Sequence, residues 1–583
     1  MRQLRGTPAS SGVGRGALVL LAPETPAAGG RIEAGRADAE IERLAACVSS
    51  AADSLDALAL DVAAAGHADE AGIFSAQAAM ARDPALAAAA ETRIRAGHDA
   101  IGAIEAAGAE LADQLRGLGD ELLSARAADV EDVVDRIAGL LAGRSGRRPT
   151  LDRPAVVVAA DLSPSLAASL PRDRLLGFAL EAGSPTSHAA ILARAYGIPA
   201  VVGVPGLLAA VEAGKGRNPE GSPTIAIDGD SGEVVIDPDE ATARRFAGRM
   251  AEAARASERA LAEADLPVVT VDGTAVSLLA NIGTPGESER AIALGARGVG
   301  LFRTEYLFLE RSAPPSEDEQ TEAYRSVVEA FRPHPVTIRL LDVGGDKPIP
   351  YLPIAREANP FLGVRAVRLA PERPELFVTQ LRATMRAAAV KGGPAGSVRV
   401  MAPMIADASD VDVLESLAAR ARSSLEREGI AHGEVALGVM LEIPSAVLVG
   451  DSYFGRLAFA SLGTNDLLQY TLAVDRGNRE LARYQDWLHP ALLRLIAAAV
   501  QASARAGIDL SVCGEMAGDP VASLALVGLG IRQLSMATSS LAPVRRAIRA
   551  CRLDVLERTA VGALDLPSAA AVRERFARLL GSA

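Results

Sequence analysis

Cysteine is scarce in this chain of 583 residues, which excludes a fold built on disulfides. The three cysteines, Cys47, Cys513 and Cys551, are few and odd in number, which is typical of a protein in a reducing compartment. The opening residues Met1 to Gly6 are not followed by the apolar run of a secretory signal peptide. We therefore expect a cytoplasmic protein.

Long apolar runs and aromatic residues are also lacking. No apolar run approaches the roughly 20 residues that a bilayer-spanning helix needs, so no membrane segment is expected. Aromatic residues make up 3% of the chain and the formal net charge is −13. Few aromatic rings are available for stacking on bases, and the negative charge repels a phosphate backbone. We expect small anions or a protein as partners, and neither nucleic acid nor membrane.

The length of the chain suffices for about three domains of ordinary size. A strand pattern at residues 17–21 resumes after residue 154 as short β-rich runs separated by short helices. Residues 1–22 and 148–236 are therefore expected to form one β/α domain. Residues 23–147 contain a series of helical patterns and are expected to be a helical insert. The glycines at positions 12, 14 and 16 predict a plain turn, since no Lys-Ser/Thr pair of a P-loop follows them.

The second half of the sequence predicts a barrel. Residues 237–265 are rich in Ala, Glu and Arg and are expected to form a polar linker helix. Over residues 266–583, eight strand-like apolar runs alternate with helical stretches, which is the pattern of a (β/α)8 (TIM) barrel. The runs are Val276–Ala280, Gly298–Phe302, Val336–Leu340, Val398–Met401, Ala436–Leu441, Leu457–Leu462, Leu510–Val512 and Gln533–Met536. The predicted fold is thus a multidomain α/β protein.

One histidine, His188, stands where a helix should begin. Turn-forming and hydroxyl residues, from Gly183 to Ser187, precede it, and an apolar run follows as far as Gly197. The N–H groups and positive dipole of a helix start would stabilise an anion, such as a phosphoryl group, on the imidazole. Thr186 or Ser187 could then orient the ring. The alternative is that these residues merely cap a helix and that the histidine is incidental.

Charged side chains gather where the barrel strands are expected to end. Arg303, Arg339 and Arg476 would converge there with Glu442 and Asp466. Arginines in that number suit a small ligand with more than one anionic group. Two carboxylates suit Mg²⁺ that completes its shell with substrate phosphate and water. The alternative for any single Arg–Glu pair is a salt bridge at the rim of the barrel.

Cys513 also follows a predicted barrel strand. Most lone cysteines are small core residues, but a thiol at this position could donate a proton to a substrate. Glu515, two residues further on, could keep that proton in place.

Together these stretches closely resemble Enzyme I of the phosphoenolpyruvate-dependent sugar phosphotransferase system, over nearly the whole chain. The motifs that carry the resemblance are Thr186-Ser187-His188, Ala127-Ala128-Asp129-Val130, Leu301–Glu305, Gly344–Lys347, Asn359–Arg365, Gly463–Asn478 and Cys513–Asp519.

The resemblance implies a phosphotransferase that works by relay. His188 would take the phosphoryl group of phosphoenolpyruvate, releasing pyruvate, and pass it to a histidine of the carrier protein HPr as the first step of sugar uptake. The helical insert would dock HPr, and the domain that carries His188 would swivel between barrel and carrier. A homodimer formed through the barrels is also implied.

The resemblance also assigns roles in the barrel. It implies phosphoenolpyruvate binding by Arg303, Arg339, Asn465 and Arg476, Mg²⁺ binding by Glu442 and Asp466, and protonation of the enolate carbon by Cys513.

Two departures from the family pattern are local. Gly183-Ser184-Pro185 replaces the Gly-Gly-Arg that many members have before Thr-Ser-His, so a phosphate-binding arginine is missing there. Gln77 stands where some members have histidine, which affects how HPr would be recognised.

Three other functions compete with this interpretation. A nucleotide-dependent dikinase would need an ATP-binding domain, for which no segment has the length or a glycine-rich loop. A regulatory relay protein of the nitrogen type would carry a sensory domain ahead of residue 1. A metal-dependent carbon–carbon lyase would keep Glu442 and Asp466 but would have no use for His188.

Overall fold

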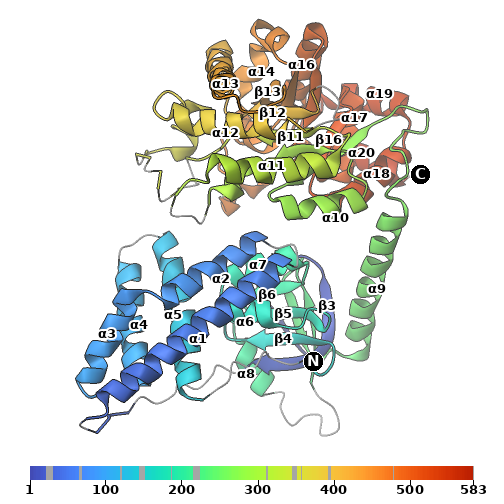
Figure 1. Ribbon diagram of the computed structural model, residues 1–583. Helices are drawn as coiled ribbons and strands as arrows, with labels where there is room; N and C mark the ends of the chain where they lie inside the picture. Colours follow the sequence, from blue (N-terminus) through green and yellow to red (C-terminus); the bar gives the residue numbers. More distant parts are fainter. Residues whose placement is uncertain are drawn as a thin grey trace. The chain divides into compact units, whose positions relative to one another are not determined.

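The structure, a computed structural model, describes residues 1–21, 30–33, 35–64, 68–117, 121–143, 151–184, 187–213, 223–309, 313–344, 349, 351–352, 354–355, 357–390, 396–476 and 478–581. These residues form two compact units, Met1–Ser257 and Glu258–Ala583 (Figure 1).

The first unit is built on a mixed sheet of eight strands in the order β1-β8-β7-β3-β4-β5-β6-β2. The strands are β1 (Arg2–Arg5), β2 (Thr7–Ser10), β3 (Val13–Leu21), β4 (Ala155–Ala159), β5 (Leu175–Leu180), β6 (Ala200–Val202), β7 (Thr224–Asp228) and β8 (Glu233–Ile236). The helices are α1 (Ala37–Ala64), α2 (Ala68–Ala81), α3 (Pro84–Arg95), α4 (Ala100–Gly117), α5 (Glu121–Leu141), α6 (Pro164–Ser169), α7 (His188–Tyr196) and α8 (Leu207–Glu212).

Helices α1 to α5 interrupt this sheet in sequence but not in space. Strands β3 and β4 pair in parallel, with Ala17 opposite Ala155, although the five helices lie between them in the chain (Figure 1). Val157 of β4 packs into the core that includes these helices. Val156 and Val158 belong to a second core on the other side of the sheet, with Leu207 of α8. The alternation along β4 therefore assigns its two faces to two cores.

Two details of this unit differ from the sequence expectation. Strands β1 and β2 were not predicted, because they are short, carry polar residues and lie at the two edges of the sheet. The glycine-rich segment predicted as a turn belongs to β3 from Val13 on. A Cβ atom at Gly14 would lie 2.1 Å from the carbonyl oxygen of Leu176, so glycine allows a close approach between backbones there.

The second unit is a closed barrel of eight parallel strands, which confirms the predicted fold class. The strands are β9 (Ser277–Ile282), β10 (Val299–Phe302), β11 (Val336–Arg339), β12 (Val398–Ala402), β13 (Ala436–Leu441), β14 (Phe459–Leu462), β15 (Asp509–Val512) and β16 (Gln533–Met536). Its helices are α10 (Ser288–Ala293), α11 (Glu317–Phe331), α12 (Pro374–Ala387), α13 (Ala408–Glu428), α14 (Pro444–Leu448), α15 (Thr464–Leu472), α16 (Pro490–Ala506), α17 (Pro520–Leu529), α18 (Leu541–Arg549), α19 (Leu553–Ala563) and α20 (Ala569–Gly581). Helix α9 (Glu240–Ala262) falls within the predicted linker helix.

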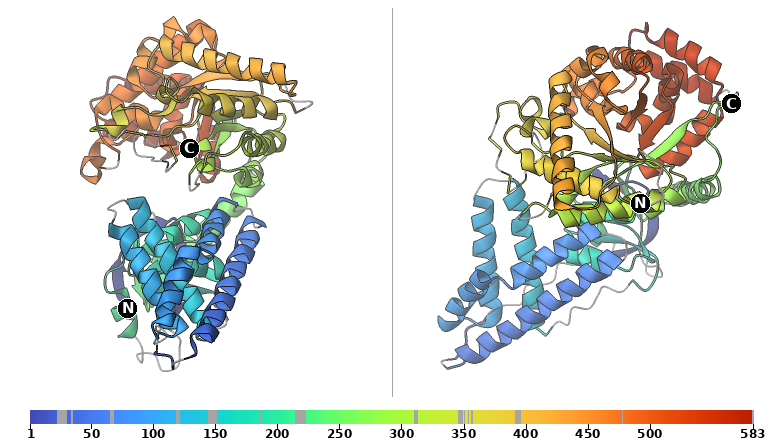
Figure 2. Two further views of the ribbon diagram at one scale, coloured as in Figure 1. Left: turned by 60° about the vertical axis from the view of Figure 1, so that its left-hand side comes forward. Right: turned by 45° about the horizontal axis from the view of Figure 1, so that its top comes forward.

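Helices surround the barrel strands, as the two further views show (Figure 2). A small cluster formed by Leu301, Met401, Met440, Phe459 and Cys513, each on or directly after a barrel strand, is buried separately from the main core of this unit. These side chains fill the inside of the barrel, so the barrel is a packed core and not a channel.

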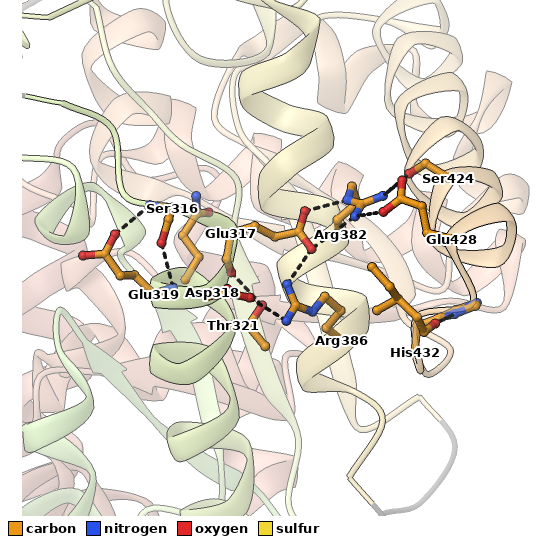
Figure 3. Close-up of polar contacts among 12 residues, drawn as sticks. Ser316, Glu317, Asp318, Glu319, Thr321, Arg382, Arg386, Ser424, Glu428 and His432 are labelled. Atoms are coloured by element: carbon orange, nitrogen blue, oxygen red, sulfur yellow. Dashed lines mark hydrogen bonds and ion pairs between the residues drawn. The ribbon is translucent and has the colours of Figure 1, made fainter.

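On the outside of the barrel, ion pairs join three neighbouring helices (Figure 3). Arg382 of α12 contacts Glu317 of α11 at 2.6 Å and Glu428 of α13 at 2.7 Å. Arg386, one turn further along α12, contacts Glu317 at 2.6 Å and Asp318 at 2.7 Å. None of the described helices has the length and apolar character of a membrane span.

Candidate active site

Helix α7 begins at His188, as the sequence predicted. Ser187 is the N-cap residue, and its hydroxyl accepts a hydrogen bond from the N–H of Ala190 at 3.4 Å. The helix ends before Gly197, whose φ of 63° lies in the left-handed region that favours glycine. The N–H groups of the first helical turn therefore lie close to the backbone of His188.

Two predictions for this segment fall outside the described residues. Pro185 and Thr186 are not described, and neither is the side chain of His188. The phosphoryl-acceptor role of His188 and the supporting role of Thr186 therefore stay predictions. The remaining site residues belong to the second unit.

A pocket of about 550 Å³ lies at the carboxyl ends of the barrel strands. Its lining includes every residue of the second unit for which a role was predicted, namely Arg303, Arg339, Glu442, Asn465, Asp466, Arg476, Cys513 and Glu515. These residues come from five strand ends and the loop after α15. The fold thus brings together side chains that lie up to 212 positions apart, from 303 to 515 in the sequence.

Arg339 is part of a buried ion-pair network. Its Nη2 atom lies 2.9 Å from Oε2 of Glu305, and its Nη1 atom lies 3.6 Å from Oδ2 of Asp342. Burial would lower the pKa of Arg339, but the charges of Glu305 and Asp342 raise it above its ordinary value. The guanidinium therefore stays charged and is held in one orientation.

Arg365, for which the sequence predicts no role, has 1% of its surface exposed. Its Nε and Nη2 atoms donate hydrogen bonds to the two carboxylate oxygens of Asp342 at 3.0 and 2.8 Å. The Nη2 atom also lies 3.6 Å from Oδ2 of Asp466. In the sequence, Arg365 follows loop-forming residues and looks like a solvated loop charge. Only its place in the Asn359–Arg365 motif pointed to the site.

Glu442 and Asp466 are two buried carboxyl groups that repel each other. Burial raises the pKa of Glu442, and the negative charges of Asp466 and Asp342 raise it further. Oε1 of Glu442 accepts a hydrogen bond from the N–H of Met404 at 2.6 Å. Oδ1 of Asp466 is buried without a hydrogen bond from a described residue, and Nη1 of Arg476 lies 3.4 Å from it.

These two carboxylates fit a divalent cation that is completed by other ligands. The described residues include no group of three or more His, Cys, Asp or Glu side chains that could hold a metal. Mg²⁺ characteristically binds one or two carboxylates and takes the rest of its shell from substrate phosphate and water. A cation between Glu442 and Asp466 would also offset the repulsion that raises the pKa of Glu442.

Asn465 joins the ends of β14 and β15. Its Oδ1 atom accepts a hydrogen bond from the N–H of Glu515 at 3.2 Å. The two segments meet closely, because a Cβ atom at Gly514 would lie 1.9 Å from Oγ1 of Thr464. Glycine is therefore required at this point of the site.

Cys513 presents a protonated thiol to the pocket. It is buried, and its Sγ atom donates a weak hydrogen bond to the carbonyl oxygen of Leu462 at 3.7 Å. Burial raises the pKa of this thiol to about 11. A thiol that keeps its proton at neutral pH suits a proton donor better than a nucleophile. The supporting role of Glu515 stays a prediction, since its side chain is exposed.

Three family models match most of the chain in succession. The model described as PEP-utilising enzyme, N-terminal, matches residues 5–126, and the mobile domain of PEP-utilising enzymes matches residues 151–232. The PEP-binding domain of PEP-utilising enzymes matches residues 257–553, which include every lining residue discussed above.

Curated relatives match over nearly their full lengths. The chain is 42% identical to the phosphoenolpyruvate-protein phosphotransferase of Streptomyces coelicolor over 580 residues, covering 98% of both chains. It is 37% identical to the protein of the same name in Cupriavidus necator over 594 residues, covering 99% of both. A solution structure of Enzyme I (nEIt) is 30% identical and covers 43% of this chain and 98% of its own, with a TM-score of 0.37.

Proposed function

The chain belongs to the phosphoenolpyruvate-protein phosphotransferase family, and from this we propose that it moves the phosphoryl group of phosphoenolpyruvate to His188 and then to a carrier protein. The observation that carries the proposal is the pocket in which Arg303, Arg339 and Arg476 lie beside two carboxylates and a protonated thiol. Phosphoenolpyruvate combines a phosphate, a carboxylate and an enol carbon that must gain a proton. The pocket offers a group suited to each of these.

The arginines act on the two anionic groups of the substrate. Arg339 is already charged and oriented by Glu305, so little reorganisation is needed when phosphate or carboxylate binds. Arg303 and Arg476 line the same pocket and add bidentate contacts. Asn465 supplies an amide that its bond to the backbone of Glu515 holds in place.

Glu442 and Asp466 would hold Mg²⁺, and such an ion would supply charge neutralisation for the phosphoryl group. Removing the negative charge of either carboxylate would weaken that binding. The raised pKa of Glu442 means that protons compete with the cation for this site.

The transfer is balanced by one bond broken and one formed, followed by a proton transfer. The bond between phosphorus and the enol oxygen breaks as Nε2 of His188 forms a bond to phosphorus. The electron pair stays on the enol oxygen, which leaves the enolate of pyruvate. The thiol of Cys513 then gives its proton to the methylene carbon, pyruvate leaves, and the thiolate regains a proton from water.

We propose that the carrier is HPr and that helices α1 to α5 provide its docking surface. We also propose that the protein acts in the cytoplasm, as a homodimer formed through its barrels. Support for a carrier comes from the family, whose members are named for transfer to protein.

Labelled phosphoenolpyruvate tests the proposal. The intact protein is incubated with substrate and Mg²⁺, and purified HPr is added afterwards. We expect acid-labile, base-stable label on the intact protein that then moves to HPr, and no label on His188→Ala. His432→Ala, which changes a histidine next to β13, is the matched control and should accept label normally. Label that persists on His188→Ala, or that requires a nucleotide, would contradict the proposal.

A further inference from the structure

Arg573, on helix α20, contacts two segments that lie far from it in the sequence. Nε and Nη2 of Arg573 donate hydrogen bonds to the carboxylate of Asp486 at 3.1 and 2.8 Å. Its Nη1 atom donates to Oδ2 of Asp519 at 2.8 Å. Arg573 thus uses all three nitrogens of its guanidinium, and the bond to Asp486 is bidentate.

Asp486 stabilises the turn that carries one wall of the pocket. Its Oδ1 atom also accepts a hydrogen bond from the N–H of Leu488 at 3.0 Å, and its carbonyl oxygen accepts one from the N–H of His489 at 3.0 Å. Trp487, inside this turn, lines the pocket. The position of Trp487 therefore depends on how Asp486 is held.

The residue before Asp486 extends this wall to one of the predicted substrate arginines. The side-chain Nε2 atom of Gln485 donates hydrogen bonds to the backbone carbonyl oxygens of Asp475 and Arg476 at 3.2 and 3.3 Å. Gln485 and Arg476 both line the pocket. Holding Asp486 in place therefore also supports the loop that carries Arg476.

Asp519 stabilises the segment that follows Cys513. Its Oδ1 atom accepts hydrogen bonds from the N–H groups of Val521 and Ala522 and so caps α17. Between Cys513 and Asp519 lies one short 3₁₀ helix, Glu515–Gly518. Asp519 thus fixes the far end of the segment that begins at the proposed proton donor.

We propose that Arg573 is a positioning residue that locks two segments to each other, residues 484–487 and 513–519, each of which carries part of the pocket wall. Arg573 does not touch the substrate and acts only through Asp486 and Asp519. The inference rests on the proposed function in taking this pocket as the phosphoenolpyruvate site, but the locking of the walls can be measured without any substrate.

The sequence offers a direct probe, because Trp487 is its single tryptophan. In Arg573→Met, we expect acrylamide to quench Trp487 fluorescence about two-fold more strongly than in the unchanged protein. Without the bonds from Arg573, the segment around Trp487 should undergo local opening more often. Arg573→Lys keeps the charge but loses the bidentate geometry, so it should restore only part of the protection. Arg578→Met is the matched control, because Arg578 lies on the same helix and is 74% exposed beside Glu574.

A kinetic measurement on the same variants tests the consequence for the site. The rate constant kcat/KM for phosphoenolpyruvate should fall about 10- to 100-fold in Arg573→Met, because small displacements of catalytic groups are costly. Arg578→Met should change neither quantity. If quenching of Trp487 in folded Arg573→Met equals that of Arg578→Met, the proposal is overturned.

Single changes of the two aspartates keep the test decisive if Arg573→Met fails to fold. Asp486→Asn should increase quenching of Trp487, whereas Asp519→Asn should mainly increase alkylation of Cys513, read by peptide mass spectrometry. If the two variants change Trp487 quenching and Cys513 alkylation equally, the proposal that Asp486 holds one segment and Asp519 the other is overturned. If the quenching results are as expected but neither the unchanged protein nor any variant accepts phosphate from phosphoenolpyruvate, the role of Arg573 stands and only the proposed function is contradicted.

Discussion

Arg365 and Asp342 form a buried bidentate pair, with each exposed over only 1% of its side chain. The two nitrogen–oxygen distances are 3.0 and 2.8 Å. Burial removes the hydration of both ions, and their mutual attraction offsets this cost only when both members are present. Arg365 also lies 3.6 Å from Asp466. The pair therefore contributes both to the stability of the barrel and to the position of this predicted metal ligand.

Removing one member of this pair should destabilise the barrel strongly. We expect Arg365→Met to lower the free energy of unfolding by about 3–5 kcal/mol, because the buried carboxylate of Asp342 loses its bidentate partner and keeps the longer contact with Arg339 at 3.6 Å. The double variant Arg365→Met/Asp342→Leu should lose less than that. Urea unfolding followed by circular dichroism measures both. Arg505→Met, which breaks an exposed pair with Asp451, serves as control and should change stability little.

Cys513 should be slow to alkylate at neutral pH. Its pKa of about 11 means that the reactive thiolate is rare below that pH, and the buried position limits access further. The rate with iodoacetamide should therefore keep rising as the pH is raised toward about 11. Peptide mass spectrometry distinguishes Cys513 from Cys47 and Cys551. A rate that levels off near pH 8 would show that the thiol is not held in its protonated form.

Replacing Cys513 should separate the two steps of the reaction. In Cys513→Ala, phosphoryl transfer to His188 needs no proton from the thiol, so label should still appear on the protein. Protonation of the enolate carbon should slow, by about 100-fold or more for the loss of a positioned general acid. Single-turnover labelling and pyruvate formation, measured side by side, show the difference. Equal slowing of both steps would instead assign Cys513 a role in binding.

The sequence predicted the barrel more completely than the first sheet. Parallel strands covered on both faces appear as continuous apolar runs, and Ala436–Leu441 was predicted to the residue. Strands β1 and β2 have no such pattern, because edge strands keep polar residues. Long-range antiparallel pairing, such as Arg2 with Ile236, leaves no local signal.

The same distinction applies to the site. A barrel places its strand ends around one opening, so the pocket residues Arg339, Glu442 and Cys513 could be predicted from the positions of their strands. The pairing of Arg339 with Glu305 could not, since it depends on side-chain directions at two strand ends. The pairing of Arg573 with Asp486 was missed as well. Arg573 lies on α20, which follows the last barrel strand, and nothing in the sequence indicates that this helix contacts the pocket wall.

Binding of Mg²⁺ should strengthen as the pH rises. Because the pKa of Glu442 is raised, this group is more often protonated in mildly acidic solution than an ordinary carboxyl group, and the cation binds only the carboxylate. The increase of the melting temperature caused by Mg²⁺ should therefore be larger at about pH 8.5 than at about pH 6. Asp466→Asn should abolish most of this increase at either pH. An effect of Mg²⁺ that is independent of pH would place the cation elsewhere.

Arg382 should contribute more to stability than an ordinary surface arginine. Its side chain is 13% exposed and bridges helices α11 and α13 through Glu317 and Glu428 (Figure 3). Arg382→Met keeps the aliphatic packing but loses the charge-assisted contacts with Glu317, Glu428 and Ser424, so we expect the free energy of unfolding to fall by about 1–3 kcal/mol. Arg420→Met, which loses one exposed pair with Glu375, should have a much smaller effect. Because ion pairs that are shielded from solvent are screened less by salt, the difference between the two variants should persist at about 0.5 M sodium chloride. Thermal unfolding at low and high salt measures this difference in stability. If the difference vanishes at high salt, the Arg382 contacts contribute no more than ordinary surface ion pairs.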